Sequence, residues 1–258
     1  MLTPERHLII LELLEGKKVV KIQELAEATS SSESTIRRDL SQLEKQSKLK
    51  RIHGGASLLQ RIGEELSVIE KSTKNIGEKD RIAKYAASLV REGHCIYLDA
   101  GTTTFQMIPY LTAKNIIVVT NGLTHLEALI EKNVKTYLIG GYAKQKTRAL
   151  IGSGAITSLQ NYRFDSCFMG VNGIHLEHGF TTPDPEEAFV KSLAMQLSQQ
   201  AYVVTDHTKF NEVTFSKVAE LEEATIITNE IENDLLNEFL EKTTVLTALH
   251  LQHFSQNS

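Results

Sequence analysis

Ser32-Glu33-Ser34-Thr35-Ile36-Arg37-Arg38-Asp39-Leu40 is the stretch around which the rest of this 258-residue chain is organised. Within it and just beyond it, Ile36, Leu40 and Leu43 recur at the spacing of one apolar helix stripe. The opposite face of that helix carries polar side chains, namely Ser34, Arg38, Ser41 and Lys45, with Arg37 at its flank. On such a helix, arginines reach guanine edges and hydroxyls reach phosphates in a DNA major groove. A solvated surface helix is the other interpretation of this stretch alone.

The residues on either side favour the DNA-binding interpretation. Residues 20–29 predict a second short amphipathic helix, and Ser30-Ser31-Ser32 a tight polar turn, which together make a helix-turn-helix pattern. Residues 48–51 then predict a strand, and Gly54-Gly55 the tip of a hairpin, which adds a basic wing. The predicted DNA contacts are Ser34, Thr35, Arg37, Arg38, Ser41, Lys45, Lys50, Arg51, His53 and Gly54.

The first helix of this head is expected to open at Thr3-Pro4, with Thr3 as its cap, and to end at Gly16. The winged helix-turn-helix head therefore covers residues 1–59. Residues 60–75 carry several charges and no clear period, so they predict a linker. Residues 76–258 form the second predicted domain.

Helices alternate with short apolar runs from residue 76 onwards. The predicted strands are residues 95–98, 116–120, 134–139, 166–171, 202–205, 225–228 and 244–249. The predicted helices are residues 78–92, 123–131, 186–199 and 233–241. This alternation is typical of an α/β domain around a mostly parallel sheet.

Small polar loops follow several of these strands, where open α/β sheets bind their ligands. Asp99-Ala100-Gly101-Thr102-Thr103-Thr104 offers N–H groups and hydroxyls that suit a phosphate, although Pro109 should kink or restart the helix that follows. Asn121-Gly122, Gly140-Gly141, Gly170-Val171-Asn172-Gly173 and Asp206-His207-Thr208-Lys209-Phe210 end later strands. Lys209 would supply a matching positive charge. Ordinary turns and a solvated lysine are the alternatives.

Two motifs closely resemble the DNA-binding domain of DeoR-type bacterial transcriptional regulators: residues 34–40, Ser-Thr-Ile-Arg-Arg-Asp-Leu, and residues 50–56, Lys-Arg-Ile-His-Gly-Gly-Ala. The resemblance covers nearly the whole chain, because the strand-end loops stand where the family pattern has them. It implies a sensor domain similar to the ribose-5-phosphate isomerase and glucosamine-phosphate deaminase fold. It also implies two partners, double-stranded operator DNA and a phosphorylated sugar.

The same resemblance names an effector site. The expected residues are Asp99, Gly101, Thr102, Thr103, Thr104, Asn121, Gly141, Asn172, Asp184, Glu187 and Lys209. Residues 181–188 resemble the fructose-operon repressors of Gram-positive bacteria, and this alone favours fructose 1-phosphate over tagatose 6-phosphate, the effector implied by related lactose-operon repressors. Lys71-Ser72 stands where many members carry an arginine, which leaves an effector contact from the linker open.

A sugar-phosphate isomerase is the second function class, because the fold is shared. Proton transfer between adjacent carbons needs a placed base. Gly170-Val171-Asn172-Gly173 holds neither a carboxylate nor a lysine, and Glu187 alone lacks partners, so the sequence predicts binding without turnover. His175, Glu177 and His178 lie between glycines and predict a solvated loop without a metal ion.

Charge and composition agree with a DNA-binding head on a larger body. Residues 1–62 carry 11 Lys+Arg against 8 Asp+Glu, and the rest carries 17 against 24. Cys95 and Cys167 predict buried free thiols. No signal peptide and no apolar run of ~18 residues is apparent, so a cytoplasmic protein is expected. The sequence thus predicts a homodimeric or homotetrameric repressor of sugar-catabolism genes, needing no cofactor.

Overall fold

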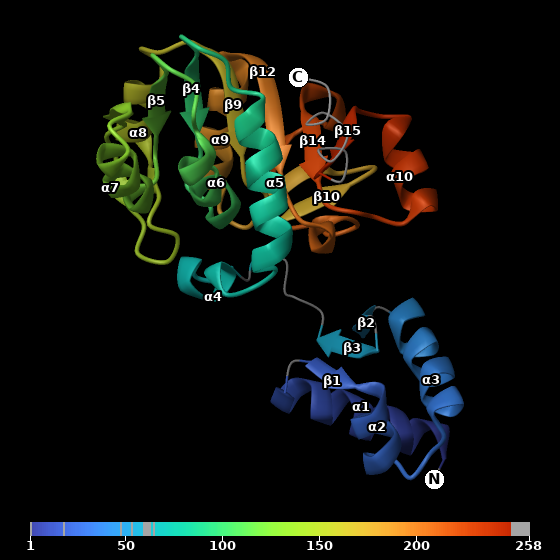
Figure 1. Cartoon of the computed structure of the whole chain (residues 1–258). Coiled ribbons are helices and arrows are strands. Elements are labelled where there is room, and N and C mark those ends of the chain that lie inside the picture. Colours follow the sequence, from blue (N-terminus) through green and yellow to red (C-terminus); the bar gives the residue numbers. More distant parts are fainter. Residues whose placement is uncertain are drawn as a thin grey trace. The chain divides into compact units, whose positions relative to one another are not determined.

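The structure is a computed structural model that describes residues 2–17, 19–46, 48–52, 54–58, 63 and 65–248. The chain divides into two compact units, Met1–Arg61 and Ile62–Ser258. Figure 1 shows the elements of each unit. His53 and most of residues 59–64, which include the start of the predicted linker, lie outside the described residues.

The first unit is a winged helix-turn-helix, as predicted. Its elements are α1 (Thr3–Lys17), β1 (Val19–Lys21), α2 (Ile22–Ala28), α3 (Glu33–Lys45), β2 (Leu49–Ile52) and β3 (Gly55–Leu58). The strands form an antiparallel sheet of order β1-β3-β2, and the β2–β3 hairpin turns at Gly54, whose φ of +78° suits a glycine. Two predictions were wrong. Thr3 is the first helical residue of α1, and Val20 lies in β1 because it pairs with Ala56.

The core of this unit is built from the predicted apolar stripe of α3. Ile36, Leu40 and Leu43 are buried with Leu25 of α2 and residues of α1 and the sheet. Ser32 caps α3, because its Oγ accepts a hydrogen bond from the Thr35 N–H at 3.3 Å. Burying this stripe turns the Ser/Arg face of α3 outward.

The second unit is an α/β domain around a parallel sheet of order β15-β14-β12-β9-β4-β5-β6. The strands of this sheet are β4 (Cys95–Leu98), β5 (Ile117–Thr120), β6 (Lys135–Leu138), β9 (Phe164–Met169), β12 (Ser198–Val204), β14 (Thr225–Thr228) and β15 (Val245–Thr247). Its helices are α4 (Val68–Ser72), α5 (Ile76–Ser88), α6 (Thr102–Met107), α7 (Leu123–Glu131), α8 (Ser153–Leu159), α9 (Pro185–Gln196) and α10 (Asn233–Leu240). The predicted class, helices alternating with a parallel sheet, is confirmed.

Helices cover both faces of this sheet (Figure 1). Alternate residues of one strand point to opposite faces, so Ile96 and Leu98 join the core under α5, α6 and α7, while Tyr97 joins the core under α8, α9 and α10. Short apolar strands buried on both sides explain why the sheet could be read from the sequence as continuous apolar runs.

Several elements of the second unit were missed or misplaced. A second, antiparallel sheet of β10 (Gly173–His175), β11 (Gly179–Thr182) and β13 (Ser216–Ala219) was not predicted, nor was the β7 (Tyr142–Ala143) and β8 (Leu150–Ile151) pair. The helix predicted for residues 186–199 ends at Gln196, because Ser198 already pairs with Phe164 of β9. As expected, Pro109 ends α6 and restarts the chain as a 3-10 turn, Ile108–Tyr110.

The predicted linker, residues 60–75, is a structured part of the second unit where it is described. Ser67 caps α4 in a capping box with Glu70, and the Val68 N–H donates to the Lys146 carbonyl at 3.0 Å. The short charged turn carries no apolar periodicity, so no sequence pattern indicated it. No helix in the described part of the chain is both long and apolar enough to span a membrane.

The order of the parallel strands locates a ligand site. From β4 the chain winds outward through β5 to β6, then returns to the other side of β4 with β9 and continues to β12. The strand order therefore reverses between β4 and β9. Open α/β sheets bind ligands outside the carboxyl ends of the strands at this point.

Candidate functional site

The outward face of α3 is the candidate DNA-binding surface. Arg37, Arg38 and Ser34 are exposed. The Arg37 guanidinium donates to Glu33 at 3.2 Å, whereas Arg38 has no hydrogen-bond or ion-pair partner within the described part of the chain. An exposed arginine whose donors are free can turn all of them to a nucleic acid.

The wing is fixed to this helix by Arg51 of β2. Its guanidinium donates to the Ser41 hydroxyl at 2.8 Å, and its backbone N–H donates to Glu44 at 2.7 Å. The predicted contacts Arg37, Ser41 and Arg51 therefore lie together, and Ser41 and Arg51 position each other. Lys45 is exposed on the same helix, and Lys50 is half-buried in β2.

Asp39 of the same motif has a role that the sequence did not reveal. It is buried, and its carboxylate accepts from Arg6 of α1 at 2.5 Å and 3.0 Å, with His7 Nε2 at 3.3 Å. Burial raises the pKa of Asp39, but the Arg6 guanidinium lowers it by more than burial raises it. The pKa of Asp39 therefore lies below its usual value. The pair ties α1 to α3 beneath the exposed arginines.

At the reversal point of the sheet, Asp99 follows β4 and is fully buried. Its Oδ2 accepts from the Gly170 N–H after β9 at 3.0 Å, and it forms an ion pair with Lys191 of α9. Burial raises the pKa of Asp99. Burial alone lowers the pKa of Lys191, but the carboxylates of Asp99 and Glu187 raise it above its ordinary value. Lys191 was not predicted, since a single lysine in a helix carries no pattern.

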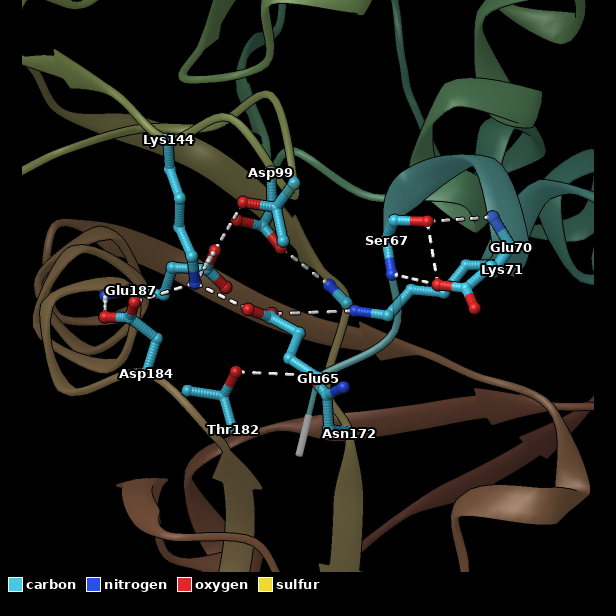
Figure 2. A network of polar contacts seen from close by, with 12 residues as sticks. Glu65, Ser67, Glu70, Lys71, Asp99, Lys144, Asn172, Thr182, Asp184 and Glu187 are labelled. Atoms are coloured by element: carbon cyan, nitrogen blue, oxygen red, sulfur yellow. Dashed lines mark hydrogen bonds and ion pairs between the residues drawn. The ribbon is translucent and has the colours of Figure 1, made fainter. Parts of the chain in front are cut away.

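Beside this pair lies a cluster of charges centred on Lys144, which follows β7 (Figure 2). Its Nζ is 2.7 Å from Asp184 Oδ2 and 3.1 Å from Glu187 Oε1. Asp184 also caps α9 through the N–H groups of Glu186 and Glu187, and the Thr147 hydroxyl donates to Glu187 at 2.6 Å. The predicted pair Asp184 and Glu187 is thus brought together, by a lysine that the sequence did not single out.

The segment that was predicted as a linker also enters this cluster. Glu65 accepts from Lys144 Nζ at 2.6 Å, and its other oxygen is 3.7 Å from Lys71 Nζ (Figure 2). Burial lowers the pKa of Lys71, and the nearby cations Lys191 and Lys209 lower it further against the effect of Glu65. Lys71 therefore lies beside the cluster through its ion pair with Glu65, and an effector contact from this segment stays a prediction.

Lys209 belongs to a second group of cations, around Asp206 at the end of β12. Burial lowers the pKa of Lys79, and the neighbouring cations Lys209 and Lys71 act in the same direction, while Asp206 opposes them. The Asp206 carboxylate is held by the Thr208 N–H at 3.0 Å and by the Asn75 amide at 3.0 Å. The lowered pKa of Lys79, with two further lysines acting on it, marks an excess of positive charge that an anion would relieve.

Other predicted effector residues have internal partners. The Thr104 hydroxyl donates to the Asp99 carbonyl at 2.6 Å, and Asn121 Oδ1 accepts from the Ala100 N–H at 2.7 Å. Both side chains are buried and shape the loop after β4. Gly141 has a φ of +126°, and a Cβ there would meet the Ile151 carbonyl at 2.6 Å. Thr103 is buried, and Gly101 and Thr102 of the same loop are half-buried.

Asn172 Oδ1 accepts a hydrogen bond from the hydroxyl of Thr182, at the end of β11, at 3.2 Å. Figure 2 shows both residues near the Lys144 cluster. The site therefore has lysines and carboxylates in contact, with amides and hydroxyls at its edge. Glu187 is a weak base here: burial raises its pKa, but Lys191 and Lys144 bring it below the usual value. This suits holding a polyhydroxy anion better than proton abstraction.

Residues 170–173 contain no carboxylate or lysine, but the fold places the Asp99 carboxylate beside Gly170, paired with Lys191 of α9, so this part of the argument against turnover was wrong. The rings of His175 and His178, at the turn between β10 and β11, stack with their centroids 4.8 Å apart. Among the described residues no group of three or more His, Cys, Asp or Glu side chains could hold a metal ion. Cys167 is buried, which raises its pKa to about 12, whereas Cys95 is only half-buried.

Comparison with known protein families matches both units. Residues 6–61 match the model of the DeoR-like helix-turn-helix domain, and residues 74–230 match that of the DeoR C terminal sensor domain. Together these matches cover most of the chain.

Individual proteins similar to this chain include regulators that match it over most of its length. The chain is 52% identical over 246 residues to the HTH-type transcriptional regulator FruR of Bacillus subtilis (strain 168), itself uncharacterised, covering 95% of this chain and 98% of that one. It is 33% identical over 231 residues to the lactose phosphotransferase system repressor of Staphylococcus aureus (strain NCTC 8325 / PS 47), covering 87% of this chain and 91% of that one. A solved ribose 5-phosphate isomerase A from Methanocaldococcus jannaschii is similar with a TM-score of 0.40 and 16% identity, over 53% of this chain and 55% of that one.

Proposed function

The chain belongs to the DeoR family of transcriptional regulators, and we propose that it represses a fructose-utilisation operon and leaves the operator when fructose 1-phosphate binds. The observation that carries the effector half is the set of lysines at the carboxyl edge of the sheet. Burial lowers the pKa of both Lys71 and Lys79, and the nearby charge of Lys209 acts on both in the same direction. A phosphate dianion would stabilise the charged form of all three lysines.

The carboxylates of the neighbouring cluster serve the sugar. Asp99, Asp184 and Glu187 accept hydrogen bonds, and sugar hydroxyls donate them. In this proposal the phosphate lies near Lys209, and the hydroxyls point towards α9. The Gly101–Thr104 loop contributes N–H groups and the Thr102 hydroxyl, while Thr104 keeps its internal bonds.

Fructose is favoured by the similarity to FruR of Bacillus subtilis and by the resemblance of residues 181–188 to fructose-operon repressors. Tagatose 6-phosphate is the second candidate, which the similarity to the lactose phosphotransferase system repressor supports. Both ligands are phosphorylated ketohexoses, so the same lysines and carboxylates would hold either one.

DNA binding is assigned to α3 and the β2–β3 wing. Arg38 is the proposed guanine contact, and Arg37, Lys45 and Lys50 are proposed phosphate contacts. One small head buries too little DNA surface for operator affinity, so we propose a homodimer or homotetramer on a repeated operator.

The test is calorimetry and a gel shift with fructose 1-phosphate, fructose 6-phosphate, tagatose 6-phosphate and free fructose. Fructose 1-phosphate should bind and release the operator, and free fructose should do neither. A tenfold loss of operator affinity needs only about 1.4 kcal/mol of coupling. Lys209→Ala should stay on DNA at ligand concentrations that release wild type. Equal action by free fructose would contradict the phosphate assignment.

The chain is a regulator and not an enzyme, and this too can be measured. Incubating the purified protein with the same sugar phosphates and following the products by NMR should give no turnover above the uncatalysed rate. The lowered pKa of Glu187 and the ion pair on Asp99 are the reasons.

A further inference from the structure

Glu65 is one of the carboxylates that contact Lys144 in the candidate effector site. Its side chain is only 6% exposed, and it accepts from Lys144 Nζ at 2.6 Å. Lys144 also contacts Asp184 and Glu187, so three carboxylates surround one ammonium group (Figure 2). An ammonium group has three N–H donors, and all of them are directed at the protein's own carboxylates.

The fit of Glu65 is incomplete. Its Oε1 is buried and has no hydrogen-bond partner among the described residues, with Lys71 Nζ 3.7 Å away as an ion-pair partner. Asp99 Oδ1 in the same site is likewise buried and without a hydrogen bond in the described part of the chain. Buried carboxylate oxygens normally have donors. Each of these two oxygens therefore lacks a donor, and the hydroxyls of a ligand are donors of the right kind.

Lys144 does not need Glu65 for charge compensation. Asp184 and Glu187 already provide two carboxylates within 3.1 Å of its Nζ. A third carboxylate adds repulsion between like charges, which opposes the contact that Lys144 favours. The bond from Lys144 to Glu65 is therefore one that a competing group can exchange.

The position of Glu65 in the chain gives such an exchange a consequence. The DNA-binding unit ends at Arg61, and Glu65 follows within a few residues. The same segment has a second attachment, from the Val68 N–H to the Lys146 carbonyl. Both attachments are made to the loop between β7 and β8, so loss of the contact between Glu65 and Lys144 removes one of the two.

We propose that Glu65 is an internal ligand of Lys144 that competes with the effector. A bound sugar phosphate takes the Lys144 donors, displaces the Glu65 carboxylate and frees the segment that leads to the DNA-binding unit. This inference rests on the proposed function, since it takes the Lys144 cluster to be part of the effector site. It adds a residue outside the predicted effector set and a physical route from the ligand to the linker.

The first experiment compares fructose 1-phosphate binding by calorimetry in wild type, Glu65→Gln and Glu70→Gln. A site blocked by Glu65 for about nine-tenths of the time binds its ligand about tenfold more weakly than an open site. Glu65→Gln should therefore bind several-fold to about tenfold more tightly than wild type. Glu70→Gln is the matched control, because Glu70 is exposed in the same segment and glutamine keeps the capping box. It should bind like wild type.

The second experiment follows amide hydrogen exchange of residues 65–75 in the full chain. Fructose 1-phosphate should raise exchange there in wild type, and Glu65→Gln and Glu65→Ala should show raised exchange without ligand. Glu70→Gln without ligand should resemble wild type. Hydrogen exchange is measured on the amides of the segment itself, so the result does not depend on operator binding.

The outcomes separate the two proposals. If wild type binds the ligand, but Glu65→Gln binds no more tightly and exchange in residues 65–75 does not rise, the competition is overturned and the effector assignment stands. Weaker binding by Glu65→Gln would make Glu65 a direct ligand contact and also overturn it. If none of the four sugars binds wild type or Glu65→Gln, the proposed function fails and the competition with it.

Discussion

The two units of this molecule handle charge in opposite ways. In the DNA-binding unit the charges assigned to function, Arg37 and Arg38, are exposed, and the buried pair of Arg6 and Asp39 holds the fold. In the sensor unit Asp99 and Glu187, two of the proposed ligand contacts, are themselves buried and are paired with Lys191 and Lys144. Binding to DNA can thus be altered without touching stability in the first unit, whereas ligand binding and stability share residues in the second.

Lys191→Met, which removes a buried charge from the sensor unit, should have the largest effect on stability. Removing the lysine leaves Asp99 buried without its cation, which should cost about 3–5 kcal/mol of sensor stability. Urea denaturation of the full chain, followed by circular dichroism, measures the loss. Lys114→Met, at an exposed lysine, should change little. Asp99→Asn combined with Lys191→Met should recover much of the loss, and a stable single variant would show that the pair is dispensable.

The substitution Asp39→Asn tests whether the stability of the DNA-binding unit also depends on a buried charge. Arg6 would keep its position without its carboxylate, and we expect a loss of about 3 kcal/mol in this unit. Hydrogen exchange of the α3 amides in the full chain measures it. Exchange in the sensor strands should be unchanged, and a loss in both units would contradict the separation.

Arg38→Ala should leave stability unchanged and weaken specific operator binding by about 1–3 kcal/mol per half-site, because a guanine contact is lost. Arg37→Ala should have a smaller effect, seen as a salt slope reduced by about one contact. Footprinting and gel shifts over a range of salt separate the two. An Arg38→Ala protein that footprints like wild type would remove the guanine assignment.

The smallest expected effect is a graded response to acid. The pKa of Asp39 is lowered in the folded state, so its contribution is complete above the ordinary carboxyl pKa of about 4 and is lost as pH falls through the lowered value. Protection of the α3 amides, measured relative to the intrinsic exchange rate at each pH, should therefore fall on acidification in wild type more than in Asp39→Asn. Equal responses would show that another group carries the acid sensitivity.

The same contrast explains what the sequence could predict. The α3 stripe and the exposed arginines follow a helical period, and the core strands are continuous apolar runs, so these features are local and readable. The partners of the sensor charges come from distant positions: Lys191 meets Asp99, and Glu65 meets Lys144. No spacing connects such residues. Resemblance to a known family supplied the loops of the site, while Lys79, Lys144 and Lys191 became visible only in the fold.

Strand β1 and the antiparallel β10-β11-β13 sheet were missed for a related reason. Each is only three or four residues long and is held by pairing with a distant strand, as Val20 is by Ala56. Tertiary pairing, and not local propensity, makes these segments extended.

The capped turn of α4, with Glu65 and Lys71 beside it, also bears on how such regulators can be recombined. A chimera joined between residues 75 and 76, the boundary predicted by the sequence, would take both side chains away with the foreign head. A chimera joined after Arg61 would keep them with the sensor to which they are bound. The first junction should yield a receptor with altered ligand response, and the second a module that carries its own sensing chemistry to a new operator.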